Sequence, residues 1–302
     1  PPCRPPPPGR AGALSDGVLL LDKPAGPTSH DLVSAVRRAF GVQRVGHAGT
    51  LDPAATGLLV VLVGRATRLA RFVAMLTKRY TGTVRFGWET TSDDAAGEPT
   101  ERDESWRATT RADVEAALAR VQRQSVQAPP AVSAKQVDGQ RAYRLARRGE
   151  AVELRPVPVT IFDLQVSSFN SSTGAAGIEV VCGSGTYVRA IARDLGRALG
   201  TRAHLAALRR TAIGLWDVRD AVVPDDALRE TGPRALRPMA EAVAHLPRLA
   251  LSVEDARRFR HGMKLDAAGR SDALVAAFEG DELLGVARLR DGVYAPDVVL
   301  AA

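Results

Sequence analysis

Short apolar runs alternate with amphipathic segments along this chain of 302 residues, and that alternation restricts the possible folds more than any other feature. Residues 17–21 (GVLLL) and 57–64 (GLLVVLVG) are continuous apolar runs of the length typical of buried strands. Residues 29–40 and 110–122 instead repeat apolar side chains at the spacing of one helix face. Further strands are expected at residues 81–88, 161–169 and 178–185, and a further helix at 186–200. The mixture predicts an α+β fold built on a mixed sheet.

Positive charge is concentrated in two segments of the chain, whose formal net charge is +7. Residues 35–85 contain nine Arg or Lys and one acid, Asp52, and residues 185–215 contain six Arg and one acid. Residues 86–116 reverse the balance, with nine acids and three Arg. Because Arg neutralises phosphates and releases counterions, the clustering favours a nucleic-acid partner. The alternative is a solvated surface in a protein that uses Arg for nearly all of its positive charge.

The sequence motifs of the common cofactor and metal enzymes are absent. There is no GxxxxGK[ST] loop, no HExxH and no GxSxG. The two cysteines, Cys3 and Cys182, cannot build a disulfide framework or a cysteine-based zinc site. We therefore expect no cofactor and no metal. No apolar run approaches the roughly 20 residues of a membrane span, and the first residues lack the apolar core of a secretion signal, so a cytoplasmic protein without membrane contact is expected.

A glycine-rich loop with one carboxylate, GHAGTLDPAATGLL (46–59), precedes the buried run at 57–64. Asp52 is the lone acid among nine cations, so its pKa should be depressed and the group should stay ionised, as a nucleophile or base requires. A structural Asp-Pro turn is the alternative interpretation of the same residues. The local chemistry does not decide between them.

Five segments of the chain match motifs of one known family, both in sequence and in their order along the chain. They are DKPAGPTSHDLV (22–33), RVGHAGTLDPAATGLLVV (44–61), KRYTGTVRFG (78–87), SAKQVDGQRAYRLARRG (133–149), and GTYVRAIARDLGRALG (185–200) followed by HLAALRRT (204–211). Together they resemble the bacterial tRNA pseudouridine synthase family of the TruB type, over residues 17 to about 215.

The resemblance implies an isomerase that converts uridine 55 in the T loop of tRNA to pseudouridine, with the T arm as its partner. It implies a pseudouridine-synthase fold, with a mixed, largely antiparallel sheet flanked by helices and a small C-terminal PUA-like β domain. We expect a disordered Pro-rich tail at 1–15, a catalytic domain at 16–245 with a basic RNA-gripping insertion at about 130–155, and the PUA-like domain at 246–302. A monomer is expected. A tRNA chaperone and a guide-dependent rRNA pseudouridine synthase are the alternative functions.

Residue roles follow from the resemblance only where the motif residue is present. Asp52 corresponds to the essential aspartate, Arg189 to the arginine paired with it, and Tyr80 to the aromatic that stacks on the target base. A uridine in a folded loop must leave its stack to be reached, and an aromatic face can replace the stacking that it loses. The residues implied to bind the substrate are Tyr187, Leu208, His47, Lys135 and Arg141.

Three further residues are interpreted without a catalytic role. Arg193 and Arg197 follow Arg189 at helical spacing and are expected to form a solvated or phosphate-facing stripe. Lys23 belongs to the first motif, and we expect it to support the loop of Asp52.

Overall fold

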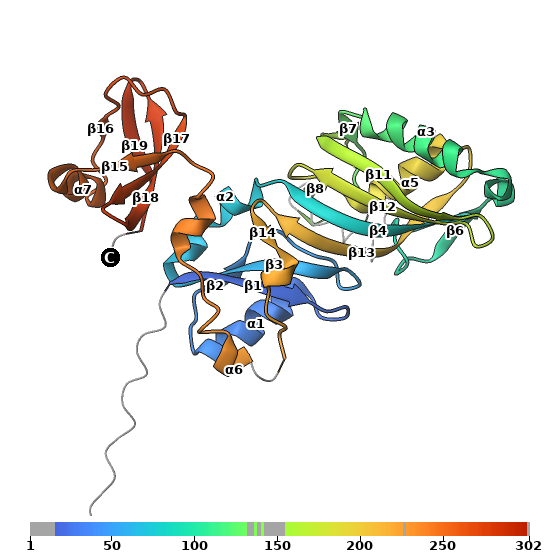
Figure 1. Cartoon of the computed structure of the whole chain (residues 1–302), viewed down its shortest axis with the longest axis horizontal. Coiled ribbons are helices and arrows are strands. Elements are labelled where there is room, and N and C mark those ends of the chain that lie inside the picture. Colours follow the sequence, from blue (N-terminus) through green and yellow to red (C-terminus); the bar gives the residue numbers. More distant parts are fainter. Residues whose placement is uncertain (1–15, 132–135, 138–139, 142–154, 226–227, 301–302) are drawn as a thin grey trace, which may run out of the picture.

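The computed structural model describes residues 16–131, 136–137, 140–141, 155–225 and 228–300. The expected tail at 1–15 and most of the insertion at about 130–155 lie outside the described residues. Figure 1 shows a long sheet flanked by helices, with a smaller β domain at one end. Within the described residues, no helix is long and apolar enough to cross a membrane.

The main sheet has eight strands in the order β1-β3-β13-β4-β12-β11, with β2 beside β3 and β14 beside β13. The strands are β1 (Gly17–Lys23), β2 (Val45–His47), β3 (Thr56–Val63), β4 (Lys78–Phe86), β11 (Ile161–Asn170), β12 (Ala175–Cys182), β13 (Ala203–Ile213) and β14 (Trp216–Asp217). Three small strand pairs accompany it: β5 (Trp88–Thr90) with β6 (Pro99–Arg102), β7 (Val126–Gln127) with β10 (Val157–Pro158), and β8 (Gln136–Val137) with β9 (Gln140–Arg141).

One parallel contact joins the two halves of this sheet. All its other strand pairs are antiparallel, whereas β13 and β3 run parallel, with Arg209 opposite Thr56 and Arg210 opposite Gly57. Gly57 has φ +100°, and a Cβ there would lie 2.2 Å from the Arg210 carbonyl oxygen. Only glycine permits this approach, which explains the Thr-Gly pair in the loop motif. The predicted mixed, largely antiparallel sheet is confirmed.

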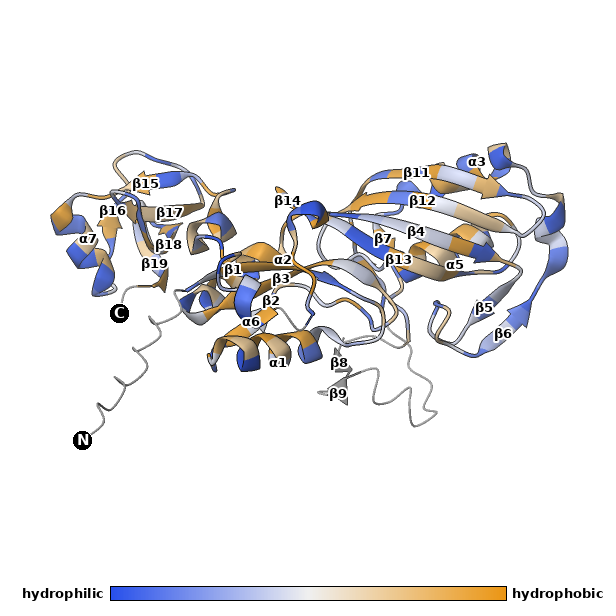
Figure 2. Ribbon diagram, turned by 60° about the horizontal axis from the view of Figure 1, so that its bottom comes forward, coloured by the Kyte–Doolittle hydropathy of each residue, from blue (hydrophilic) through white to orange (hydrophobic). Residues whose placement is uncertain are grey.

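Helices cover each half of the sheet separately. The α-helices of the described residues are α1 (Ser29–Phe40), α2 (Ala70–Ala74), α3 (Arg111–Gln122), α5 (Val188–Ala198), α6 (Leu228–Thr231) and α7 (Val253–Arg260). Helix α1 packs on β1, β2 and β3, while α3 and α5 pack on one face of β4, β11, β12 and β13. Figure 2 shows β1 and β3, whose residues are buried in the core, as hydrophobic ribbons, and the exposed β6 as a hydrophilic one. The predicted helices at 29–40 and 110–122 are present, whereas β4 begins three residues earlier than expected.

The C-terminal β domain is a five-stranded sheet with α7 packed against it. Its strands, in order across the sheet, are β15 (Arg248–Ala250), β17 (Leu274–Glu279), β18 (Glu282–Arg290), β19 (Val293–Val299) and β16 (Leu265–Asp266). Phe278 and Val298 join a hydrophobic cluster that also contains Leu62 and Leu69 of the main domain. Arg65 Nη1 donates to the Leu300 carbonyl oxygen at 3.0 Å. Apolar packing and polar contacts therefore both fix the β domain against the end of the main sheet.

Candidate active site

The loop between β2 and β3 presents Asp52, and side chains from other elements hold its backbone. Ser29 Oγ, at the start of α1, accepts a hydrogen bond from Leu51 N at 2.9 Å and donates to Leu51 O at 3.1 Å. Lys23 Nζ, at the end of β1, donates to the carbonyl oxygens of Pro53 at 3.0 Å and Ala55 at 2.7 Å. Lys23 is 0% exposed. The backbone on both sides of Asp52 is thus anchored.

Arg210 on β13 binds the same loop from the other direction. Its Nη2 donates to Gly49 O at 3.0 Å, its Nη1 to Thr50 O at 3.3 Å, and its Nε to Leu58 O at 2.8 Å. The side chain is 1% exposed. The sequence motif LRRT contains this residue, but nothing in the sequence distinguishes it from its neighbour Arg209.

Asp52 forms an ion pair with Arg189, which follows the first residue of α5. Arg189 Nε lies 3.1 Å from Asp52 Oδ2, and Arg189 Nη1 lies 3.3 Å from Asp94 Oδ2. Arg189 Nη1 also donates to Ser92 O at 2.9 Å. The Arg189 side chain is 8% exposed and that of Asp52 is 41% exposed. The guanidinium is therefore fixed between two carboxylates, and Asp52 remains accessible to a substrate.

The pKa of Asp52 is raised, not depressed as the local charge count predicted. Removal of solvent around the carboxylate raises it most, Arg189 lowers it, Asp94 raises it and Lys23 lowers it. The depressed pKa was wrong because burial outweighs the nearby cations, and because the nine cations of residues 35–85 do not all face Asp52: the Arg65 side chain, for example, binds Asp16 and the Leu300 carbonyl oxygen. A partly desolvated carboxylate next to an anchored guanidinium is suited to act as a nucleophile or base.

The expected aromatic and apolar wall is formed by side chains on two neighbouring strands of the sheet. Tyr80 on β4 and Leu208 on β13 pack against the same hydrophobic cluster. Burial raises the pKa of the Tyr80 phenol, Arg210 lowers it, and the nearby Asp52 charge raises it. Both charged groups therefore act on the Tyr80 phenol. The wall can contact the face or edge of a planar base.

Tyr187 and His47 lie at the ends of two elements that border the loop of Asp52. Tyr187 precedes α5, and its backbone N donates to Gln127 Oε1 at 2.9 Å. Gln127 is buried. His47 ends β2, and its buried Nδ1 has no hydrogen-bond partner among the described residues. Burial lowers the pKa of His47, and Arg210 lowers it further. The imidazole is therefore neutral near pH 7.

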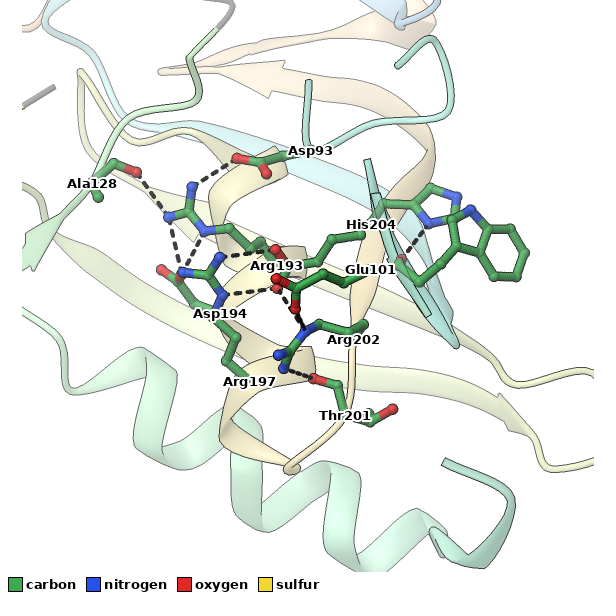
Figure 3. A network of polar contacts seen from close by, with 11 residues as sticks. Asp93, Glu101, Ala128, Arg193, Asp194, Arg197, Thr201, Arg202 and His204 are labelled. Carbon is green, nitrogen blue, oxygen red and sulfur yellow. Dashed lines mark hydrogen bonds and ion pairs between the residues drawn. The ribbon is translucent and has the colours of Figure 1, made fainter. Parts of the chain in front are cut away.

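The interpretation of Arg193 and Arg197 as a solvated or phosphate-facing stripe is wrong for Arg193, whose side chain is 9% exposed, whereas the Arg197 side chain is 56% exposed and paired with an acid. Figure 3 shows both guanidinium groups turned toward carboxylates. Arg193 Nη1 lies 2.7 Å from Asp93 Oδ2, and Arg197 binds both oxygens of Glu89 at 2.8 Å. Both acids belong to the acidic segment 86–116. That segment therefore neutralises the outer part of α5 instead of leaving it free for phosphates.

Two of the expected substrate-binding residues cannot be placed. Lys135 lies outside the described residues, and Arg141 lies on β9 without a described side chain. Among the described residues, no group of three or more His, Cys, Asp or Glu side chains could hold a metal ion. Sequence reasoning gave no role to Asp94, Arg210 and Gln127, each of which contacts residues far away in the chain.

Two family models match the chain. One describes the N-terminal domain of TruB family pseudouridylate synthases and matches residues 37–188. The other describes the tRNA pseudouridylate synthase B C-terminal domain and matches residues 189–243.

Curated relatives match over nearly the full length. The tRNA pseudouridine synthase B of Thermobifida fusca (strain YX) is 45% identical, with 95% of this chain and 99% of the relative covered. That of Leifsonia xyli subsp. xyli (strain CTCB07) is 43% identical, with 92% and 94% covered. A solved structure described as a Cbf5-Nop10-Gar1 complex contains a chain with a TM-score of 0.73 and 23% identity, with 96% of this chain and 86% of that chain covered. At this identity, the likeness shows a shared fold.

Proposed function

The chain belongs to the TruB family of pseudouridylate synthases, and we propose that it isomerises uridine to pseudouridine in tRNA. The observation that carries the proposal is the ion pair of Asp52 with Arg189 on a loop whose backbone is held from β1, α1 and β13. We further propose that the target is uridine 55 of the T loop. No net change in atoms or redox state accompanies this reaction, so substrate binding and one initiating group are its main requirements.

The proposed reaction breaks the bond between N1 of uracil and C1′, turns the base, and joins C1′ to C5. The proton on C5 is released and N1 takes up a proton, so the product is an isomer of the substrate. Asp52 initiates the reaction as a nucleophile or base. Arg189 keeps the carboxylate in place through a charge-assisted contact. Tyr80 and Leu208 form the wall against which the flipped base rests, next to Tyr187.

The RNA-binding surface is proposed to extend beyond the site. The insertion at about 130–155, with Lys135 and Arg141, would grip the T arm, and His47 would support the T loop after the base leaves it. The C-terminal β domain is proposed to be of the PUA type and to bind RNA, with a boundary near residue 245. We also propose a monomer that works in the cytoplasm.

The test is turnover and binding of a T-arm transcript by Asp52→Asn. Release of tritium from 5-³H-uridine reports the loss of the C5 proton, and filter retention reports binding. We expect Asp52→Asn to abolish release and to bind the transcript as the unaltered protein does. Asp163→Asn, at a carboxylate on β11, is the matched control and should retain full turnover.

Substantial residual turnover in Asp52→Asn would overturn the assignment of Asp52. Turnover of a transcript whose uridine 55 is replaced by cytidine, with other uridines labelled, would overturn the position of the target. A tRNA chaperone activity is a second proposal, because the basic residues of segments 35–85 and 185–215 can bind RNA whether or not Asp52 reacts. It predicts that Asp52→Asn still accelerates the refolding of misfolded tRNA.

A further inference from the structure

We propose that Arg210 is a positioning residue of the reaction, which holds the loop of Asp52 at a fixed spacing from the ring of Tyr80. Its guanidinium contacts three carbonyl oxygens, those of Gly49, Thr50 and Leu58. The first two of these residues precede Asp52 by three and two positions in the chain. The inference rests on the proposed function, because the spacing matters only if Asp52 and Tyr80 act on one substrate.

The surroundings of Arg210 differ from those of the other buried arginines. Arg189 and Arg193 are paired with carboxylates, whereas no carboxylate of the described residues lies within ion-pair distance of Arg210. A buried cation without a counter-charge is costly unless its donors are satisfied. Here the satisfying acceptors are carbonyl oxygens of the Asp52 loop and of β3. The conformation of the loop and the burial of the cation therefore depend on each other.

Arg210 also acts on Tyr80, which is its partner in the register of β13 and β4. The guanidinium lies close enough to the phenol oxygen to lower the Tyr80 pKa by its charge and by hydrogen bonding. One planar group thus contacts the loop before Asp52, the first residues of β3 and the aromatic on β4. Arginine suits this task because its fork of donors is rigid. A lysine at the same place offers one compact head group.

The positive charge of Arg210 reaches other groups at the site. It lowers the pKa of His47, and it contributes to the lowered pKa of Lys78, which is about 8. Loss of the charge should therefore raise the pKa of the His47 imidazole. This shift is a direct readout of Arg210 in its observed place, because a residue that only filled space would not change it.

The test compares Arg210→Gln and Arg210→Lys with Arg209→Gln in the full chain. We expect kcat for the T-arm transcript to fall about 100-fold in Arg210→Gln, the loss typical of a small misplacement of reacting groups. KM should change less than about twofold, since the base wall and the basic surface remain. The kcat of Arg210→Lys should lie between that of Arg210→Gln and that of the unaltered protein. Arg209→Gln removes the adjacent guanidinium, which binds Asp22, and should retain kcat.

Two measurements separate positioning from general damage to the sheet. The His47 pKa, followed by NMR titration, should rise in Arg210→Gln and not in Arg209→Gln. In a double-mutant cycle, Tyr80→Phe should lower kcat less in the Arg210→Gln background than in the unaltered protein.

Unchanged kcat in Arg210→Gln, equal losses in Arg209→Gln and Arg210→Gln, an unshifted His47 pKa, or an additive cycle would each overturn the inference. If Arg210→Gln does not fold, Arg210→Lys carries the same comparison. The proposed function fails in a different way, namely when the unaltered protein does not release tritium.

Discussion

Removal of the Arg193 guanidinium should destabilise the main domain strongly, whereas removal of the Arg197 guanidinium should not. Both arginines lie on the same helix, four positions apart, and both bind an acid from residues 86–116. Their exposure differs, because the Arg193 side chain is 9% exposed and that of Arg197 is 56% exposed. The substitutions Arg193→Met and Arg197→Met keep the apolar part of each side chain and remove its charge.

The expected loss in the free energy of unfolding follows from the contacts of Arg193. Its removal leaves the carboxylates of Asp93 and Asp194, 11% and 16% exposed, without their cation, and leaves Ala128 O without its donor. Breaking a buried ion pair typically costs about 3–5 kcal/mol. Protonation of the abandoned acids limits the loss, so we expect about 3 kcal/mol at pH 7. The Glu89 partner of Arg197 is 10% exposed, but Arg202 Nε remains 4.0 Å from it after Arg197 is removed. Because the Arg197 end of this pair is exposed and Glu89 keeps a cation, we expect a loss of about 1 kcal/mol for Arg197→Met, the upper end of the range for an exposed pair.

The stability that Arg193→Met loses relative to the unaltered protein should depend on pH in a defined direction. Burial raises the pKa of Asp93 and of Asp194, and Arg193 lowers both. Without Arg193 their folded pKa values rise further above the unfolded values, so the folded state holds more protons and its stability falls as pH rises. The deficit of Arg193→Met should therefore be largest near neutral pH and should shrink as the pH falls through the raised pKa values.

Urea unfolding followed by tryptophan fluorescence measures this deficit in the relevant domain. All three tryptophans, Trp88, Trp106 and Trp216, precede the C-terminal β domain. Replacing both partners of a buried pair is less costly than removing one, so Arg193→Met combined with Asp93→Asn should recover part of the loss. Equal losses for the two methionine variants at pH 7, or a deficit that grows at acidic pH, would refute the reasoning.

Three other perturbations test the site. Asp94→Asn should move the acidic limb of the pH–kcat profile to lower pH, because the Asp94 charge raises the pKa of Asp52; a limb that stays or moves up contradicts this. Lys23→Met should lower the free energy of unfolding by about 2 kcal/mol in urea titrations, since buried carbonyl oxygens lose a charged donor; no loss would show that the loop does not need Lys23. Gln127→Leu should leave the backbone N of Tyr187 unpaired, at a cost of about 1–3 kcal/mol in the same assay, whereas Gln127→Glu keeps an acceptor and should lose less.

The regular elements could be predicted where the sequence pattern is local. The helix at 29–40 is present over its whole predicted length because its apolar spacing and its cap are both encoded nearby. Strand β13 was not anticipated, although it lies at the centre of the sheet. Its sequence AHLAALRRTAI contains few β-branched residues and two adjacent arginines, so packing against β3 and β4 decides its conformation.

The sequence predicted which residues form the candidate site better than it predicted their ion pairs and pKa values. The motifs identified Asp52 and Arg189, which form an ion pair although they are far apart in the chain. The acids that neutralise α5 could not be assigned, because Asp93 is 100 positions from Arg193 and a charge count carries no direction. The wrong direction of the Asp52 pKa has another cause, because the burial that raises this pKa cannot be read from a charge count. Family matches support the overall fold, while the individual roles depend on the experiments above.

The parallel contact of β3 with β13 also governs when this protein can acquire its shape during synthesis. Arg210 and Leu58, which it brings together, are 152 positions apart. Contacts of such separation close large loops and form after local ones, and a growing chain presents its N-terminal part first. A nascent chain that ends before residue 189 contains the loop of Asp52 without Arg189 and without Arg210. Lys23 and Ser29 can hold that loop as soon as it is made, whereas its contacts with the two arginines are among the last to form.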